Sequence, residues 1–186
     1  MNQTLTPWIY RRWRFDFPAE LHPAIIERLR GTPARAAELL ASAPRELLAT
    51  APPQGWSIIR HIAHLDDLEP LLHARLDAYE RAEPVLPAAD MSNTKTTDQP
   101  HEQRDPAEVV AALRATRART IERLESYPPD FFARSAWHER LATQKRVVDS
   151  ALFFADHDDH HLALAVHARR QLAPGPGTPP TDTARA

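Results

Sequence analysis

The chain of 186 residues contains no cysteine, which excludes disulfide bonds, thiolate metal ligands and a cysteine nucleophile. It also lacks any apolar run approaching the roughly 20 residues that a membrane helix needs. Residues 1–15 hold no apolar segment of the kind that a secretion signal requires. These absences favour a cytoplasmic protein that contacts no membrane.

An excess of charge of either sign is missing as well. The sequence has 23 Lys and Arg against 25 Asp and Glu, and its formal net charge is -2. Because no basic field is present, we do not expect nucleic acid as a partner. Glycine is scarce, with 4 residues, whereas proline and histidine are abundant, with 18 and 10 residues. The prolines mark the ends of segments, and the histidines are where chemistry can occur.

The length and the hydrophobic fraction of 42% suit one domain with its own core. Residues 1–20 are rich in aromatic side chains, and we expect them to form an ordered, extended lead-in that covers part of this core. The domain itself is predicted to span residues 21–172. Residues 173–186 are rich in proline, glycine and threonine, which is typical of a disordered tail.

Apolar residues repeat at spacings of three and four, which predicts four main helices. They cover residues 21–42, 58–80, 106–126 and 143–172. Pro33 makes the first of them either one bent helix or two short ones, and Pro70 is expected to kink the second. Residues 82–104 are predicted to be a long crossover loop, and residues 130–142 a short irregular connection. No alternating pattern indicates a strand. The predicted fold is therefore an all-α four-helix bundle with a long crossover loop.

Two histidines of the last predicted helix, His157 and His161, fall on its inward face at a spacing of four. Imidazoles at this spacing can converge on one metal ion, as they do in zinc-binding helices. A shared metal would satisfy one nitrogen of each ring, whereas two core histidines without metal each need a hydrogen-bond partner. Both readings stay open on spacing alone. His160 lies to one side of this face.

A third ligand is sought on the helix predicted at 58–80, which carries His61, His64 and His73. His61 lies nearer the middle of the apolar stripe and His64 at its edge, so burial slightly favours His61 without deciding between them. Nearby carboxylates could ligate the metal or orient the histidines: Asp66, Asp67, Asp156, Asp158 and Asp159. The other histidines are expected on the surface or in loops: His22, His101, His138 and His167.

Three short motifs resemble those of the DinB/YfiT-like superfamily of bacterial helical-bundle metalloproteins, which is unrelated to the DNA polymerase that shares the DinB name. Trp56-Ser57 followed by His64-Leu65 resembles its W-S-x6-H-L signature. The run from His157 to Leu162 resembles its second signature, an H-x3-H pair followed by an apolar residue. The loop Ser92-Asn93-Thr94-Lys95 is similar to the asparagine–lysine loop of one branch. The resemblance extends from about Phe15 to Gln171.

This resemblance implies a four-helix bundle, commonly a homodimer, with a divalent metal, zinc or nickel, held by three histidines. Carried over to this sequence, the ligands are His64, His157 and His161, so the resemblance selects His64 over His61. It also implies that Asn93 and Lys95 help to recognise a substrate or cosubstrate. The alternative for these two loop residues is an ordinary solvated loop.

Relatives in the superfamily include transferases that use bacillithiol, mycothiol-dependent isomerases and metal-dependent hydrolases. The leading hypothesis is a metal-dependent thiol S-transferase that acts on a small-molecule substrate in detoxification or the stress response. Because the chain has no cysteine, the thiol would come from bacillithiol or another low-molecular-weight cosubstrate.

Two other functions stay open. A metal-dependent hydrolase would use the metal to activate water, but no general base is obvious beyond Asp67 and Glu69. A non-catalytic metal-binding dimer would fill the fourth metal position with a carboxylate. Three histidines leave a metal position open, which is the pattern of catalytic sites.

Overall fold

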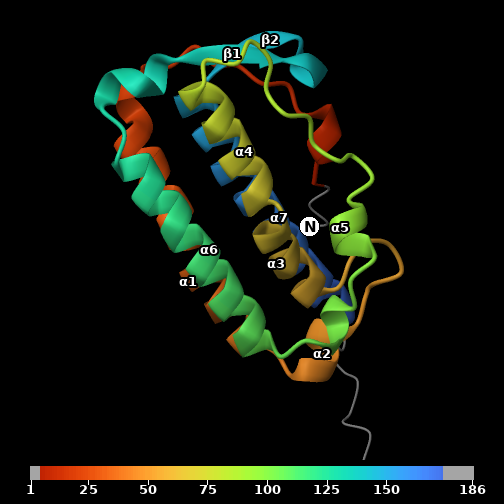
Figure 1. The fold of residues 1–186 in the computed structure, drawn as a ribbon. Helices are drawn as coiled ribbons and strands as arrows, with labels where there is room; N and C mark the ends of the chain where they lie inside the picture. Colours follow the sequence, from red (N-terminus) through yellow and green to blue (C-terminus); the bar gives the residue numbers. More distant parts are fainter. Residues whose placement is uncertain (1–4, 174–186) are drawn as a thin grey trace, which may run out of the picture.

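The computed structural model describes residues 5–173. Its long helices are α1 (His22–Ala41), α3 (Ile58–Asp67) with α4 (Glu69–Glu80), α6 (Pro106–Glu125) and α7 (Val147–Leu172). They run side by side as four columns, with α4 continuing the line of α3 (Figure 1). The columns of α1 and α3 each pack against both α6 and α7. The predicted all-α four-helix bundle is thereby confirmed.

Two prolines within the predicted helices have different effects. Pro33 lies inside α1, which continues through it as one helix because Leu29, Thr32 and Ala36 beside it are buried. Tertiary packing of this face outweighs the hydrogen bond that proline removes. The segment predicted at 58–80 is instead divided at Leu68, and Pro70 takes the first turn of α4, where a missing N–H costs little.

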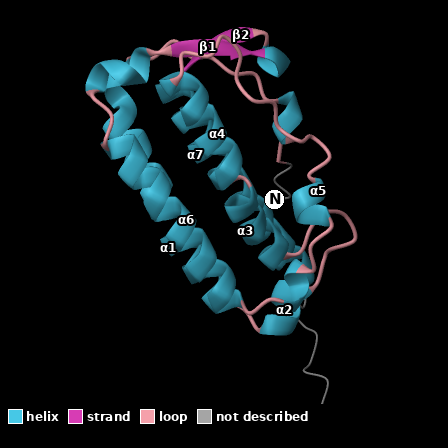
Figure 2. Ribbon diagram, viewed as in Figure 1, coloured by secondary structure: helices cyan, strands magenta, loops and turns pink. Residues whose placement is uncertain are grey.

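One prediction was wrong between α6 and α7, where two short strands form a hairpin at one end of the bundle (Figure 2). Strand β1 (Ser135–His138) pairs antiparallel with β2 (Thr143–Arg146). The 3-10 helix η4 (Pro129–Ala133) precedes β1, and the 3-10 helix η5 (Glu139–Leu141) connects the two strands. Each strand has four residues, too few for an alternating pattern to stand out. Helix α7 therefore begins at Val147 instead of Thr143, and Asp149 caps it by accepting from the Arg146 N–H at 2.8 Å.

The crossover between α4 and α6 contains the short helix α5 (Thr94–Thr97) and the 3-10 helix η3 (His101–Gln103), both packed against α3. Arg60 of α3 holds it there, because its guanidinium donates to the carbonyls of Thr96 and Thr97 and pairs with Glu102. A further short helix, α2 (Arg45–Ala49), also packs against α3. The crossover therefore lies against the element that carries His64.

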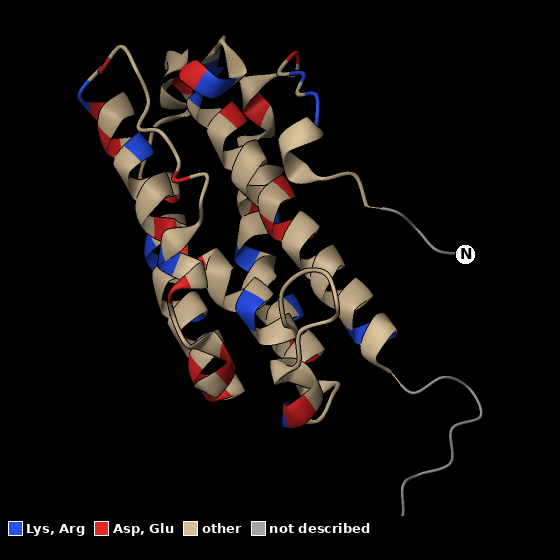
Figure 3. Ribbon diagram, turned by 90° about the vertical axis from the view of Figure 1, so that its right-hand side faces the viewer, with Lys and Arg blue, Asp and Glu red and all other residues tan. Residues whose placement is uncertain are grey.

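The N-terminal segment contains the 3-10 helices η1 (Trp8–Tyr10) and η2 (Ala19–Leu21). Four of its aromatic side chains pack against the core: Trp8, Trp13, Phe15 and Phe17. The predicted tail lies outside the described residues except for Ala173. Acidic and basic residues are interspersed along the helices in the ribbon of Figure 3. Over residues 5–173, no helix combines the length and apolarity needed to cross a membrane.

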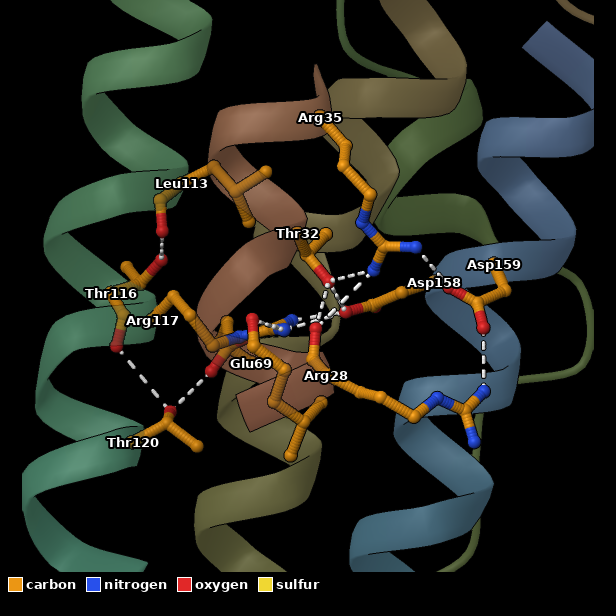
Figure 4. Close-up of polar contacts among 11 residues, drawn as sticks. Arg28, Thr32, Arg35, Glu69, Leu113, Thr116, Arg117, Thr120, Asp158 and Asp159 are labelled. Carbon is orange, nitrogen blue, oxygen red and sulfur yellow. Dashed lines mark hydrogen bonds and ion pairs between the residues drawn. The ribbon is translucent and has the colours of Figure 1, made fainter. Parts of the chain in front are cut away.

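A polar layer divides the core into two apolar clusters. It takes one buried side chain from each column of the bundle: Thr32, Glu69, Arg117 and Asp158. The Arg117 guanidinium donates to Asp158 at 2.5 Å and to Glu69 at 2.6 Å, and the Thr32 hydroxyl donates to Asp158 at 2.7 Å (Figure 4). This polar layer satisfies the buried charges and fixes how α7, with its histidines, lies against the other helices.

Candidate metal centre

Three buried histidines from two helices meet inside the bundle. His64 comes from α3, and His157 and His161 come from successive turns of α7. One ring nitrogen of each lies within 4.8 Å of the others. Their ring centroids are 4.4 Å apart for His157–His161 and 4.5 Å apart for His64–His161. We call this group the three-histidine cluster.

The three-histidine cluster fits a divalent metal ion. Nitrogen ligands at about 2.0–2.1 Å from a tetrahedral ion lie about 3.4 Å from one another. The nitrogens here need to approach by at most about 1.4 Å to reach that separation, because all of them lie within 4.8 Å of one another. Neutral imidazole is also the donor that zinc and similar ions accept most often. Over residues 5–173, no other group of histidines and acids meets this geometry.

Hydrogen bonds fix which nitrogen of His64 is free. The Thr96 hydroxyl has one hydrogen, which it donates to Oδ2 of Asp67 at 2.8 Å. It must therefore accept from His64, whose Nδ1 lies 2.9 Å away and so carries the proton. His101 Nε2 meets the same Asp67 oxygen at 3.0 Å. The Nε2 of His64 is left unprotonated and able to bind a metal.

His61 is buried too, but it lies behind the three-histidine cluster. Its Nδ1 is 3.0 Å from Nδ1 of His161, so one of these two nitrogens donates to the other. If His161 donates, its Nε2 keeps a lone pair for a metal. Of the two histidines left open by spacing, the structure brings His64 to the pair on α7, whereas His61 lies outside the cluster and contacts His161.

Burial keeps these rings neutral. It lowers the pKa of His64 to about 4 and that of His61 to about 3. The pKa values of His157 and His161 are held well below the ordinary range, first by burial and then by neighbouring histidines. Neutral imidazoles offer a lone pair at pH 7 without first losing a proton.

Two tryptophans wall the three-histidine cluster. The Trp56 ring lies 5.0 Å from His64 and 5.8 Å from His161, and the Trp8 ring lies 5.0 Å from His157. In the sequence, Trp56 belongs to the W-S-x6-H-L motif and Trp8 to the aromatic lead-in. Trp56 lies one residue before Ser57, whose side chain caps the start of α3, so its place beside His64 could be inferred from the sequence. Nothing local indicates that Trp8 reaches α7.

All three histidines of the cluster line one cavity of about 650 Å³. Much of its wall is apolar or aromatic, including Leu68, Leu71, Leu86, Phe153 and Phe154. Asn93 also lines the cavity and caps α5 with a left-handed φ of 56°. Lys95 points elsewhere, because its Nζ donates to the Asp67 carbonyl at the end of α3 at 3.0 Å.

Several other histidines differ from expectation. His101 and His138 were predicted on the surface or in loops, yet both are buried. The reason is tertiary: the crossover folds back onto α3, and the hairpin closes one end of the bundle. His22 and His167 are partly exposed. His160 is buried and lines the cavity, and its Nδ1 has no partner among the described residues.

None of the five candidate carboxylates belongs to the three-histidine cluster. Asp67 reaches His64 indirectly, through Thr96. Asp66 accepts from Thr116, and Asp158 lies in the polar layer. The remaining two, Asp156 and Asp159, pair with Arg28.

The helical bundle and the three histidines that converge beside a cavity are the features of a helical-bundle protein with a candidate site for one metal ion. Residues 28–165 match the model of the DinB superfamily, and the chain belongs to this family. A comparison with curated proteins gives no match.

Two solved structures share the fold. YfiT from Bacillus subtilis, described as a probable metal-dependent hydrolase with an unusual four-helix bundle topology, is 18% identical with a TM-score of 0.73, covering 86% of this chain and 92% of its own. The mycothiol-dependent maleylpyruvate isomerase is 12% identical with a TM-score of 0.61, covering 80% of this chain and 60% of its own. At these identities the likeness establishes the fold alone.

Proposed function

We propose that the protein holds one divalent cation, zinc or nickel, on His64, His157 and His161, and that it transfers a low-molecular-weight thiol such as bacillithiol to an electrophilic small molecule. The observation that carries this proposal is the three-histidine cluster at the wall of the 650 Å³ cavity. No carboxylate lies within ligand distance among the described residues, so a bound cation would keep a position open toward the cavity.

A divalent cation on neutral histidines would act as a Lewis acid and lower the pKa of a thiol or water that takes the open position. The chain has no cysteine, so the thiol belongs to a cosubstrate. Thr96 holds His64 in the tautomer that ligates, and the apolar wall at Leu68, Leu71 and Phe154 excludes water from the reacting atoms.

The two candidate general bases, Asp67 and Glu69, are already paired with other groups, which favours thiol transfer over hydrolysis. Asp67 accepts from Thr96 and meets His101, and Glu69 is buried against Arg117. Neither is free to act as the general base for water. Hydrolysis stays the second candidate because YfiT, the neighbour with the higher TM-score, is described as a hydrolase. A non-catalytic metal-binding dimer is disfavoured because no carboxylate stands ready to close the metal's coordination shell.

The test is fluorescent conjugation of monochlorobimane with bacillithiol by the metal-loaded protein. We expect product formation that stops when a chelator removes the metal and in His161→Ala, but persists in His167→Ala, which alters a histidine outside the cluster. Esters, amides and lactones are assayed in parallel. If the protein hydrolyses these substrates but conjugates neither bacillithiol nor mycothiol, the hydrolase replaces the transferase as the proposed function.

We also propose that the protein is a homodimer, as the family resemblance implies, and that it serves detoxification or the stress response in the cytoplasm. Light scattering of the purified chain tests the dimer, and a monomer at micromolar concentration would remove that part of the proposal.

A further inference from the structure

The cavity beside the three-histidine cluster has a second polar region, which is cationic. Arg75 of α4, His138 of β1 and Arg140 of η5 line it together. Neither arginine forms an ion pair with any residue between 5 and 173. The proposed function gives this region no role.

Arg75 is the central group, since only 2% of it is exposed. Its Nε donates to the Pro87 carbonyl at 3.1 Å, and its Nη2 lies 3.3 Å from Nε2 of His138. Its Nη1 has no partner among the described residues. Two donors compete for the His138 ring, because the Leu141 N–H donates to its Nδ1 while Arg75 faces its Nε2. A neutral imidazole accepts at one nitrogen only, so His138 cannot accept from both.

Arg117 in the same bundle shows what a buried arginine ordinarily requires. It is equally buried and is held by two carboxylates, Glu69 and Asp158. Removing a guanidinium from water is costly unless an anion compensates. Arg75 has the burial of Arg117 without its anions, and it faces a cavity.

The surroundings of Arg75 contain a second buried basic group and no buried carboxylate that pairs with Arg75. Lys145 is fully buried with Nζ 3.7 Å from the centre of the Phe153 ring and without a hydrogen-bond partner. Burial and the charge of Arg75 hold the pKa of Lys145 well below its ordinary value. Two carboxylates line the cavity. Asp90 accepts hydrogen bonds from Ser92 and Thr94, and Glu139 is exposed and forms no ion pair with Arg75 or Arg140.

We propose that Arg75, supported by His138 and Arg140, is an anion subsite and that the molecule bound in the cavity carries a carboxylate there. A carboxylate matches the planar guanidinium and brings a single negative charge, which suits an apolar pocket better than a doubly charged phosphate. The apolar wall at Leu71 and Phe154 would pack against the rest of the molecule. This inference names the substrate class of the proposed function, but its binding step needs no metal.

The test compares two probes that differ in one group, 4-phenylbutyrate and 4-phenylbutan-1-ol, by titration calorimetry on the full-length chain. The metal-free protein is the primary sample, because a carboxylate could also bind a metal, and the metal-loaded protein is measured beside it. We expect the wild type to bind the acid at least tenfold more tightly than the alcohol. Arg75→Met should bring the acid to the affinity of the alcohol and leave the alcohol unchanged.

The matched control is Arg119→Met, which removes an exposed positive charge from α6 and should change neither affinity. The melting temperature separates a binding role from a structural one. Because Arg75→Met removes an unpaired buried charge, we expect its melting temperature to stay the same or to rise. Arg75→Lys, which keeps the charge, should retain part of the preference for the acid.

Three results would overturn the inference. The wild type could bind the acid no more tightly than the alcohol, as it would if water satisfied Nη1. Arg75→Met could keep the preference, or it could lose stability together with both affinities. Metal content is measured on the same samples. If the wild type binds no metal but still prefers the acid, the proposed function is rejected while the anion subsite is supported.

Discussion

His64 Nδ1 lies 2.9 Å from the hydroxyl oxygen of Thr96, and this contact sets which nitrogen of His64 can bind a metal. Replacing Thr96 by Val removes the acceptor and leaves the ring free to rotate or change tautomer. Outer partners of this kind are typically worth about 10–100-fold in metal affinity. We expect Thr96→Val to weaken zinc binding by about tenfold or more, measured by competition with a chromophoric chelator.

Thr97→Val is the control for this variant, because the Thr97 hydroxyl is exposed and bonds only within its own segment. It should bind zinc like the wild type. Equal zinc affinity of Thr96→Val and Thr97→Val would show that the contact does not orient a ligand.

The stability of the metal-free protein should fall as the pH falls from about 6.5 to about 4. Burial lowers the pKa of His64 to about 4, whereas an unfolded histidine titrates near 6.5. In that window the unfolded chain takes up protons that the folded chain excludes, so protons favour unfolding. The stabilisation is complete above pH 6.5. Urea denaturation at pH 7.5, 6.5, 5.5 and 4.5 measures the slope.

His64→Gln should make this slope shallower, by up to about 1.4 kcal/mol per pH unit for one proton. A wild-type unfolding free energy that stays constant between pH 7.5 and 5 would mean that these histidines are not held neutral by burial.

Arg117 should contribute more to stability than any exposed arginine. Arg117→Met leaves the carboxylates of Glu69 and Asp158 buried without their cation. Breaking a buried ionic group in this way costs about 3–5 kcal/mol. Arg119→Met, on the exposed face of α6, should stay within about 0.5 kcal/mol of the wild type. Similar unfolding free energies for the two variants in urea would contradict the role given to the polar layer.

The sequence was sufficient to predict the four-helix bundle, but not the hairpin of β1 and β2 that closes one end of it. Apolar spacing located all four columns, because each helix buries a stripe repeated over several turns. The hairpin was missed because strands of four residues, such as Thr143–Arg146, carry almost no periodic signal. The burial of His138 depends on this hairpin and was missed with it.

The candidate site, too, could be predicted from the sequence only in part. His157 and His161 follow from helix geometry, since residues four apart share a face. Spacing left the third histidine open, and family resemblance selected His64 before the structure placed it beside the pair. Trp8, Thr96 and Arg75 could not be found from the sequence, because each acts through contacts between segments far apart in the chain.

The central claim is tested most directly by elemental analysis of protein purified without a histidine tag. The wild type should retain about one zinc or nickel ion per chain after dialysis. His64→Ala, His157→Ala and His161→Ala should each lose most of it, whereas His61→Ala, which changes a supporting ring, should keep it with lower affinity. Stoichiometric metal in all three of the first variants would contradict the account.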